Sequence, residues 1–414
     1  MQTQPASKLK LAVFDVEGVL IPRNRLFFEV GKTLGAWALL KILFFGFLYE
    51  AGLMRLKPAL ERLFGVTRGA KPEVFQQSFQ KLPLMPDAPK LFAALRAQGC
   101  KTALISSGLP TALLEGLARK VGADYAIGVE VGVQDGILTG EVWGDVVERD
   151  GKLLVLKEIM EAENASVNEC AVVADDRNNA SIFLKGMRRV GYNPDFIIRT
   201  KADTVVTGGI MKLLPAINAE PRRRALPSKK DVVREVIHGS GFFVPLIAAL
   251  VGLVPVASAI LAVVAVYVFS ELMRMKGQNL PVISTITCYA ASQSEQCEFT
   301  MAPVYFAAGI LLALLLFPTP AGSAAVAIFA LGDSSASLIG GLLAGKPLSF
   351  NKAKSLEGSL GGFLFAFLAG CVFVPPWMAL VGAAVAMAVE SLPLPVNDNI
   401  LIPLCAGLVV TLLI

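Results

Sequence analysis

The feature that most constrains this chain is the unequal distribution of charge along its 414 residues. From Gly239 onward there are only twelve Asp, Glu, Lys and Arg residues, and the preceding stretch carries nearly all the others. Overall, 54% of the residues are hydrophobic and 17% are charged, which is too apolar for an ordinary soluble protein. A soluble first half joined to a membrane-embedded second half explains this distribution better than a uniform fold does.

Net charge, cysteine usage and the first residues limit the expected partners and the cellular compartment. The formal net charge of +5 is too small to indicate nucleic-acid binding, and the basic runs at 222–224 and 229–230 favour a segment beside an anionic leaflet. The six cysteines are scattered without a CxxC pair, so neither a zinc site nor a disulfide framework is expected, which fits a reduced cytosol. The first residues lead into an apolar strand pattern without the hydrophobic core of a signal peptide, which predicts a cytosolic first half.

Residues 1–218 are expected to form an α/β domain with a doubly wound parallel sheet. Asp15 and Asp175 stand at the ends of two expected strands, and Ser106 stands at the end of a third. Ligands of open α/β sheets bind beyond the carboxyl ends of the strands, so a site is expected at these three residues. The residues from about 22 to 90 are mostly helical in pattern and are expected to form a cap. The four expected strands are residues 9–16, 101–107, 169–175 and 195–200.

Within the expected cap, the segment from Gly35 to Leu48 is strongly apolar. It is too short for a membrane span and is interrupted by Lys41. Two interpretations remain open: a helix buried inside the cap, or an interfacial helix that lies on the bilayer.

Residues 219–233 are expected to form a basic linker, and residues 234–414 an all-α polytopic membrane domain of about seven transmembrane helices. If Arg234 is cytosolic, the charge pattern follows the positive-inside rule, because the turns at 254–255, 318–320 and 375–376 contain no Lys or Arg. The basic residues then on the cytosolic side are Arg274, Lys276, Lys346, Lys352 and Lys354. The apolar segments are residues 242–256, 257–273, 301–317, 322–344, 358–374, 377–391 and 400–414.

Ionisable residues inside or beside membrane spans are costly, by ~2.5–3.5 kcal/mol at a span centre, yet here they occur in clusters. Clustering indicates a function, because passive spans do not need such residues. The clusters are Arg234 with the only histidine, His238; Glu271 with Arg274; the glycine-rich run 332–362; and Glu390 with Asp398 and Asn399.

The glycine-rich run contains the groups that phosphoryl transfer requires. Glycines leave backbone N–H groups accessible to phosphate, and lysines supply positive charge for a polyphosphate. Asp333, Glu357 and Asp398 are candidates to share a Mg²⁺ ion, which prefers carboxylates together with phosphate oxygens. The alternative is that the small residues simply pack transmembrane helices. The candidates for nucleotide and phosphate binding are Gly340, Lys346, Lys354, Glu357 and Gly358, together with Arg234 and Arg274.

The order and spacing of these residues resemble a known family. The patterns Asp333-x-x-Ala336, Lys354-Ser355-x-Glu357-Gly358, and Glu390 followed by Asp398-Asn399 are similar to motifs of the CTP-dependent dolichol, phytol and diacylglycerol kinases. The resemblance covers about residues 230–414. It implies CTP as phosphoryl donor, Mg²⁺ as cofactor and a lipid hydroxyl as acceptor, with an isoprenoid alcohol expected first and diacylglycerol second.

The catalytic candidates in this half are Asp333, Asp398 and His238, although His238 has the alternative of an ordinary interfacial residue. Two other enzymatic interpretations remain open. One is a CDP-lipid synthase, whose Asp-rich C-terminal signature is missing here, and the other is a membrane-anchored phosphatase whose spans present lipid without catalysis. A transporter or scaffold with two decayed enzyme domains is the non-enzymatic alternative, and an oligomer is compatible with any of these interpretations.

The first half resembles the haloacid-dehalogenase superfamily, and its phosphoserine-phosphatase-like members in particular. The resemblance spans about residues 8–215 and rests on VFDVEGVL, ALISSG, VVADDRNN and the stretch from Val131 to Lys152. It implies an aspartyl-phosphate at the nucleophile Asp15. It also implies that Ser106 holds the phosphoryl group, that Lys152 neutralises charge, and that Asp175 or Asp176 binds Mg²⁺ with Asp15.

Three positions depart from that family's pattern. Glu17 stands where the family has an Asp as general acid and base, and ångström-scale misplacement of such a group can cost about 10²-fold in rate. Asn179 replaces an Asp near the metal, and Asn24 falls where phosphoserine phosphatases place an acidic residue for the substrate ammonium. The domain is therefore expected either to hydrolyse a phosphate ester other than serine phosphate, or to be a degenerate regulatory or structural domain.

Overall fold

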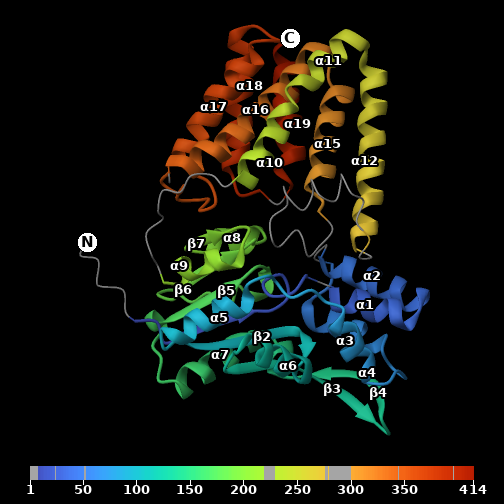
Figure 1. The fold of residues 1–414 in the computed structure, drawn as a ribbon, viewed down its shortest axis with the longest axis vertical. Helices are drawn as coiled ribbons and strands as arrows, with labels where there is room; N and C mark the ends of the chain where they lie inside the picture. Colours follow the sequence, from blue (N-terminus) through green and yellow to red (C-terminus); the bar gives the residue numbers. More distant parts are fainter. Residues whose placement is uncertain are drawn as a thin grey trace. The chain divides into compact units, whose positions relative to one another are not determined.

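The structure is a computed structural model that describes residues 8–23, 25–50, 53–218, 229–275, 278, 300–343, 345–394 and 396–414. The chain divides into two compact units, Met1–Pro221 and Arg222–Ile414, and each is described by itself below (Figure 1). The division falls within the segment expected to be a linker.

Unit 1 is built on a seven-stranded sheet with the order β4-β3-β2-β1-β5-β6-β7. All neighbouring strands are parallel except β3 and β4, which form an antiparallel hairpin. This arrangement is the doubly wound α/β fold expected from the sequence. The strands are β1 Leu11–Asp15, β2 Lys101–Pro110, β3 Tyr125–Gln134, β4 Ile137–Trp143, β5 Cys170–Ala174, β6 Arg188–Tyr192 and β7 Thr204–Val206.

The central strand β1 lies between β2 and β5 and is buried at every position. Such uninterrupted apolar strands are typical of parallel sheets with both faces covered. Asp15 is the last residue of β1 and lies opposite Ile105 of β2, so Ser106 is the next residue at the same edge. Asp175 follows the last residue of β5, and the sheet therefore brings the three predicted strand-end residues to one edge.

The prediction of a strand at residues 195–200 is wrong. Residues Phe196–Lys201 form the helix α8, because the Asp195 side chain caps its N-terminus by accepting a hydrogen bond from Ile198 N at 2.9 Å. Within this helix only Ile198 is buried, whereas a strand inside the sheet would bury alternate residues. The parallel strands beyond β5 are instead β6 and β7, which contain fewer apolar residues in a row.

Four helices between β1 and β2 form the cap, and the helices that follow flank the sheet. The cap helices are α1 Arg25–Leu34, α2 Ala36–Glu50, α3 Leu56–Gly65 and α4 Glu73–Gln80. The other helices of unit 1 are α5 Ala88–Ala97, α6 Thr111–Val121, α7 Gly151–Ala162, α8 Phe196–Lys201 and α9 Leu213–Ile217. Short 3₁₀ helices lie at Asp145–Val147, Val167–Glu169, Arg177–Asn179 and Ile210–Lys212.

Helix α2 is not buried inside the cap. Ile42 packs against Gly31 of α1, and Ile42 is the one residue of α2 that is fully buried among those whose side chains are described. The outer side of the helix exposes large apolar side chains, of which Trp37 is 71% and Phe47 65% exposed. This geometry leaves the interfacial alternative open and argues against a helix enclosed by the cap.

Unit 2 is a bundle of helices in which α16 is central. Thirteen residues of α16 are buried, and α16 packs against α10, α15, α17, α18 and α19. The helices are α10 Lys229–Ser240, α11 Phe243–Val251, α12 Leu253–Met275, α15 Ala302–Leu316, α16 Thr319–Leu343, α17 Leu356–Gly370, α18 Pro376–Ser391 and α19 Asp398–Leu413.

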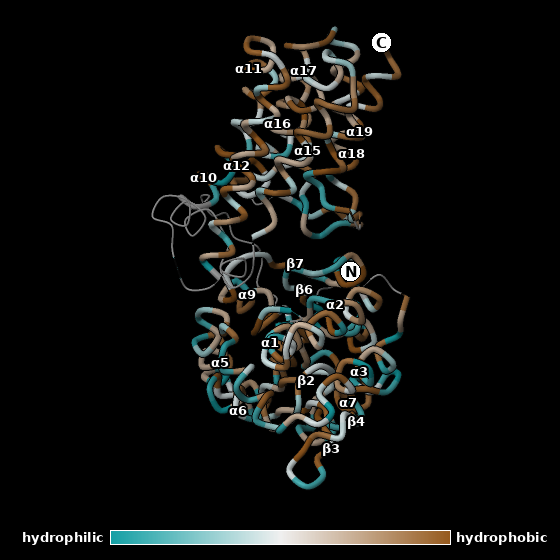
Figure 2. The backbone as a smooth tube through the Cα atoms, turned by 90° about the vertical axis from the view of Figure 1, so that its right-hand side faces the viewer, coloured by the Kyte–Doolittle hydropathy of each residue, from teal (hydrophilic) through white to brown (hydrophobic). Residues whose placement is uncertain are grey.

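Within the described residues, three helical stretches are long and apolar enough to cross a membrane: Asp231–Val251, Leu253–Arg274 and Thr319–Leu343. They indicate membrane association. The expectation of about seven spans is not confirmed, because α15, α17, α18 and α19 have only 15 or 16 residues, below the usual length of ~20. Along the tubes of unit 2 in Figure 2, brown apolar segments predominate.

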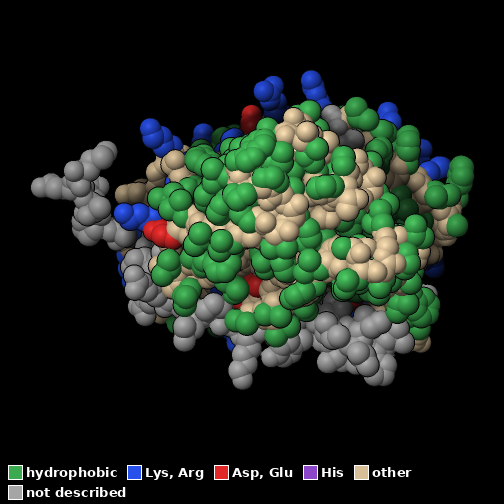
Figure 3. Space-filling view, turned by 90° about the horizontal axis from the view of Figure 1, so that it is seen from above, with side chains coloured by type: hydrophobic (Ala, Val, Ile, Leu, Met, Phe, Trp, Pro, Cys, Tyr) green, Lys and Arg blue, Asp and Glu red, His purple; other side chains and the backbone are tan. Residues whose placement is uncertain are grey.

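The boundary between the first two expected spans is corrected by the structure. The turn lies at Gly252, not at 254–255, because Gly252 adopts a φ of +93° and Pro255 fits the first turn of α12. Figure 3 looks onto the end of unit 2 that carries this turn and the α17–α18 turn, and hydrophobic side chains cover much of it. The turn residues 252, 317–318 and 371–375 contain no Lys or Arg.

Candidate functional site

Asp15 is presented at the end of β1 by a tight turn. Leu20 N and Ile21 N donate to Val16 O at 2.8 and 3.1 Å, and Gly18 N donates to Ile21 O at 2.7 Å. Gly18 has a φ of +80°, and a Cβ at this position would collide with the carboxylate of Asp175. The turn therefore requires glycine, and it brings Glu17 to the same cavity as Asp15.

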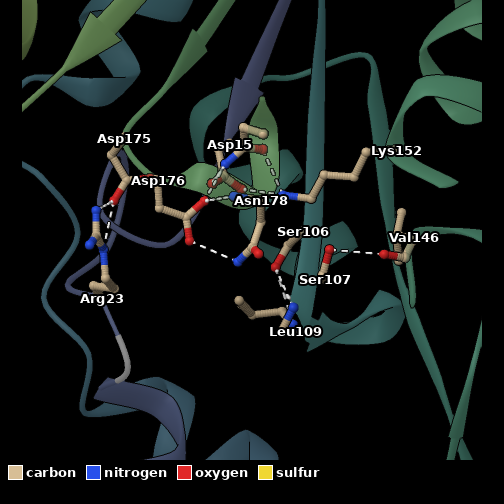
Figure 4. Close-up of polar contacts among 12 residues, drawn as sticks. Asp15, Arg23, Ser106, Ser107, Leu109, Val146, Lys152, Asp175, Asp176 and Asn178 are labelled. Atoms are coloured by element: carbon tan, nitrogen blue, oxygen red, sulfur yellow. Dashed lines mark hydrogen bonds and ion pairs between the residues drawn. The ribbon is translucent and has the colours of Figure 1, made fainter. Parts of the chain in front are cut away.

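The two carboxylate oxygens of Asp15 have separate partners (Figure 4). Lys152 Nζ, in the first turn of α7, donates to Asp15 Oδ1 at 3.1 Å, and Asn179 Nδ2 donates to Asp15 Oδ2. Lys152 also donates to Asn179 Oδ1 at 2.7 Å, and its side chain is only 5% exposed. The lysine is thus fixed beside the carboxylate whose charge it was predicted to neutralise.

Three carboxylates gather at this edge of the sheet. Oxygens of Asp15, Asp175 and Asp176 lie within 4.8 Å of one another, which is the only such acidic group found among the described residues. Asp175 Oδ1 is buried and has no hydrogen-bond partner among them, whereas Arg23 Nε donates to Asp175 Oδ2 at 2.8 Å. A buried carboxylate oxygen without a partner beside two other carboxylates fits Mg²⁺, which prefers oxygen ligands. These residues therefore fit the predicted cofactor.

Burial and mutual repulsion perturb the ionisable groups of this site. Burial raises the pKa of Asp175 well above its ordinary value; Asp176 and Asp15 raise it further, and Arg23 partly offsets the effect. Burial, with Asp15 and Asp176, also raises the pKa of Glu17 to about 8. Burial alone would lower the pKa of Lys152, but the surrounding carboxylates, Asp15 first, outweigh it and raise that pKa. The site holds more acidic than basic groups, an arrangement that a cation stabilises.

Two serines of β2, Ser106 and Ser107, follow Ile105, which is the last residue of β2 that pairs with β1. Ser106 Oγ is buried and accepts hydrogen bonds from Gly108 N at 3.1 Å and Leu109 N at 3.2 Å, which fixes the loop. Ser107 Oγ donates to Val146 O at 3.0 Å. Ser107 and Gly108, not the predicted Ser106, line the cavity.

The site opens into a cavity of about 70 Å³ between the sheet edge and the cap. A larger groove of about 840 Å³ shares Leu56, Ser107, Lys152 and Asn178 with it and gives a route to solvent. The sequence did not indicate that Arg23, Tyr49 and Asn178 would also line the cavity, because their spacing from the motifs carries no signal. The cavity is lined by Asp15, Glu17, Arg23, Phe27, Tyr49, Leu56, Ala59, Leu60, Leu63, Ser107, Gly108, Lys152, Asp176 and Asn178.

Comparison with known proteins identifies the class of unit 1. Residues 12–178 match the family description "haloacid dehalogenase-like hydrolase". The phosphoserine phosphatase of Methanocaldococcus jannaschii is 25% identical over 201 residues, which are 48% of this chain and 92% of that protein. The phosphoserine phosphatase of Archaeoglobus fulgidus is 26% identical over 152 residues, and the chain spans only 44% of its length.

A solved structure, the unliganded probable phosphoserine phosphatase of Vibrio cholerae, aligns with a TM-score of 0.46 at 24% identity and covers 51% of this chain and 65% of that one. Because residues 12–178 match that family description, unit 1 is a haloacid-dehalogenase-like domain, and its sequence is similar to those of phosphoserine phosphatases. Its α/β fold agrees with the resemblance inferred from the sequence. The position predicted for the substrate ammonium, Asn24, lies outside the described residues.

Unit 2 gathers several of its predicted residues in a second cluster. Lys354 Nζ pairs with the carboxylate of Glu390 and lies 3.7 Å from Asp398 Oδ2. His238 Nδ1 lies 3.4 Å from Asp333 Oδ2, and the charges of Asp333 and Lys354 also interact. Residues separated by up to 160 positions in the sequence are thus brought to one region of the bundle.

Other predicted residues of unit 2 lie in separate local contacts. Arg274 pairs with Glu271 at 2.8 Å, and Arg234 pairs with Glu235 at 2.9 Å. Glu235 was not among the residues predicted from the sequence. Glu357 accepts a hydrogen bond from Lys346 N at 2.8 Å, whereas the Lys346 side chain is exposed. Asp333, Glu357 and Asp398 do not form a metal-binding group of the kind found in unit 1, as far as the described residues go.

Two glycines of the run 332–362, Gly340 and Gly358, have a packing role. A Cβ at Gly358 would lie 2.7 Å from Ala336 O and 3.1 Å from Gly340 Cα, where α16 crosses α17. Ser355 caps α17 by accepting from Gly358 N at 3.2 Å. Gly340 and Gly358 therefore allow close helix contact, as the packing alternative expected.

Proposed function

We propose that unit 1 hydrolyses phosphate monoesters through an aspartyl-phosphate at Asp15. The observation that carries this proposal is the gathering of Asp15, Lys152, Asp175 and Asp176 at one edge of the sheet. A carboxylate nucleophile needs positive charge beside it to approach a phosphate dianion. Lys152 supplies such charge from the protein, and Mg²⁺, held by Asp15, Asp175 and Asp176, would supply more when bound.

The chemistry divides into two steps. In the first, Asp15 attacks phosphorus, the bond to the ester oxygen breaks, and Glu17 gives its proton to the departing alcohol. In the second, water attacks the aspartyl-phosphate, Glu17 accepts a proton from that water, and inorganic phosphate leaves as Asp15 is regenerated. Glu17 lines the same cavity as Asp15, which is the position that this acid and base role requires.

The test is the release of phosphate from a panel of monoesters by the full chain in detergent, with Mg²⁺ and with EDTA. We expect hydrolysis that requires the metal and is lost in Asp15→Asn. Serine phosphate belongs in the panel because the similar proteins are phosphoserine phosphatases. Absence of hydrolysis under every metal condition would instead favour a regulatory or structural domain.

We further propose that unit 2 transfers the γ-phosphate of CTP to the hydroxyl of a membrane lipid, an isoprenoid alcohol first and a glyceride second. The supporting observation is the Lys354 cluster, because ionisable groups placed among apolar helices are costly unless they serve a function. Lys354 would bind phosphate oxygens, and CTP would bring Mg²⁺ with it. The lipid oxygen attacks the γ-phosphorus, the bond to the β-phosphate oxygen breaks, CDP leaves, and the hydroxyl proton passes to Asp333 or Asp398.

This second proposal is tested with CTP labelled in either the γ- or the α-phosphate, and with ATP as a control. Transfer of the γ-label to a lipid alcohol, lost in Asp333→Asn and kept in Asp15→Asn, is the expected result. Transfer of the α-label would identify a CDP-lipid synthase, and absence of both labels would leave a membrane-anchored phosphatase. The same proposal places unit 1 and the cluster of unit 2 on the cytoplasmic side, which accessibility of Glu158→Cys, at an exposed position of unit 1, and of Lys354→Cys to impermeant reagents would check in sealed vesicles.

A further inference from the structure

The wall of the unit 1 cavity that faces the sheet is polar, whereas the wall formed by the cap is apolar. The described lining residues from α1, α2 and α3 are Phe27, Tyr49, Leu56, Ala59, Leu60 and Leu63. The hydroxyl of Tyr49, the one polar side-chain group in that set, donates to Asn178 Oδ1. With the phosphate at Asp15, the alcohol part of a monoester faces these apolar side chains. This wall suits a hydrocarbon better than an amino acid.

Helix α2 connects this cavity to the outer surface of the cap. Its last turn carries Tyr49, whose backbone carbonyl accepts from Arg177 and whose ring lies 5.0 Å from the Arg177 guanidinium. Arg177 belongs to the same loop as Asp176. The helix that reaches the cavity at one end is thus attached directly to the loop that carries a site carboxylate.

The outer side of α2 is a continuous apolar stripe. Trp37, Leu40, Phe44 and Phe47 recur at helical spacing, and each is more than half exposed. The exposed Leu53 follows the helix and precedes Leu56 of the cavity wall. A patch of large apolar side chains of this kind marks an interaction site, not a solvated surface.

A lipid bilayer fits this stripe better than another protein surface does. Tryptophan and tyrosine near the two ends of the helix, with the exposed Lys32 and Lys41 close by, are the residues that anchor interfacial helices at anionic membranes. The same chain carries three helices long and apolar enough to cross a membrane, which indicates membrane association and so favours a bilayer as the partner of α2. The groove beside the cavity adds Arg55, Lys57 and Lys201, which suits an anionic phosphate at the membrane surface.

We propose that α2 lies in the bilayer interface and that unit 1 hydrolyses the phosphate monoester of an apolar alcohol taken from that bilayer. The inference rests on the proposed phosphatase activity and adds the substrate class. The 70 Å³ cavity holds the phosphate and the first carbons, and the rest of the chain lies along Leu56 and the α2 stripe. Burial of one methylene group contributes ~0.8 kcal/mol, which corresponds to about a fourfold change in rate. Each of the first methylenes of the substrate that is buried against the cap should therefore raise kcat/KM about fourfold.

The position of α2 is tested by quenching of tryptophan fluorescence with brominated lipids in liposomes that contain the full chain. The chain has three tryptophans, so two variants isolate the informative ones. One keeps only Trp37 (Trp143→Phe with Trp377→Phe), and its matched control keeps only Trp143, which is 52% exposed on β4 of the same unit (Trp37→Phe with Trp377→Phe). We expect quenching of Trp37 and none of Trp143. Equal quenching of both, or of neither, overturns the placement of α2, including the case in which another protein surface covers it.

The substrate class is tested with alkyl and prenyl phosphates of increasing length and with serine phosphate. We expect kcat/KM to rise with chain length, and Phe44→Gln with Phe47→Gln to lower it about tenfold more for a long-chain phosphate in liposomes than for butyl phosphate. Leu154→Gln, at a residue 55% exposed on α7, is the matched control and should change neither. A flat dependence on length, or a preference for serine phosphate, overturns the inference and leaves the proposed function standing. No hydrolysis of any ester overturns the proposed function itself.

Discussion

The two charged clusters of this chain differ in how their charges are balanced. In unit 1, Asp15, Asp175 and Asp176 lie together with a buried oxygen that has no partner among the described residues, so negative charge is in excess. In unit 2, Lys354 is held between Glu390 and Asp398, and Asp333 faces His238. The first arrangement leaves a carboxylate oxygen for a cation, whereas in the second each carboxylate has a basic side chain beside it. A site prepared for a metal ion is therefore recognised by clustered carboxylate oxygens that the protein does not pair, not by the number of its ionisable residues.

The largest expected effect is on the nucleophile of unit 1. Asp15→Asn keeps the size of the side chain but removes the attacking charge, so hydrolysis of any phosphate monoester should fall by about 10³-fold or more. Phosphate release and CTP-dependent lipid labelling are measured on the same preparation. Loss of both activities in this variant would contradict the separation into two sites.

The next largest effect is expected at the Lys354–Glu390 pair of unit 2. Lys354→Met leaves the nearly fully buried Glu390 without its cation, and breaking such a pair costs about 3 kcal/mol. The melting temperature in detergent should therefore fall, and the second change Glu390→Leu should restore much of it. If Lys354→Met does not alter the melting temperature, then Lys354 and Glu390 do not form a stabilising pair.

A smaller effect on stability is expected from glycine substitutions, and it distinguishes a packing role of these glycines from a role in phosphate binding. Gly358→Ala places a methyl group against Ala336 O, and overpacking of this kind costs roughly 1–3 kcal/mol. Gly341→Ala is the matched control, because a Cβ there meets nothing within 4 Å and alanine favours a helix. Thermal unfolding of the two variants should move in opposite directions. A Gly358→Ala protein of unchanged stability with weakened CTP binding would instead assign the glycine to the nucleotide.

The raised pKa of Glu17 makes stability depend on pH. The unfolded chain loses this proton near the ordinary value of 4.5, whereas the folded protein keeps it until about 8. The folded state binds more protons in this window, so its stability falls as the pH rises from about 4.5 to about 8 and stays lower above it. The Glu17→Gln variant has no ionisable group at this position, so it does not lose stability in this way as the pH rises. In EDTA, its melting temperature should therefore exceed that of the wild type increasingly across the window, whereas a change at the exposed Glu158→Gln should not.

The sequence predicted that certain residues of unit 1 lie at one edge of the sheet, because they stand at the ends of apolar runs. Asp15, Ser106 and Asp175 each terminate an apolar run, and parallel strands bring such residues to one edge of a sheet. It failed at residues 195–200, where the local cap from Asp195 outweighed an apolar run of three residues. Arg23 and Tyr49 could not be predicted, because their places depend on how the β1 turn and the cap helices pack.

In unit 2 the sequence predicted which residues are unusual but not how they pair. Lys354, Glu390 and Asp398 stood out because charge is rare in that half, and the structure brings them together. Glu357 was expected at a metal but lies at the start of α17, where an acidic side chain stabilises the helix end and accepts from Lys346 N. Spacing alone does not distinguish a helix cap from a metal ligand, because both use a carboxylate near glycine and serine.

The most direct test of the account is to look for phosphate on Asp15 during turnover. The full chain is mixed with a phosphate monoester carrying labelled phosphorus, quenched in acid after less than one turnover, and digested for mass spectrometry. The account predicts a hydroxylamine-sensitive label in the peptide that contains Asp15 and none in Asp15→Asn. Hydrolysis that proceeds in the wild type without such a label, or that persists in Asp15→Asn, would contradict it.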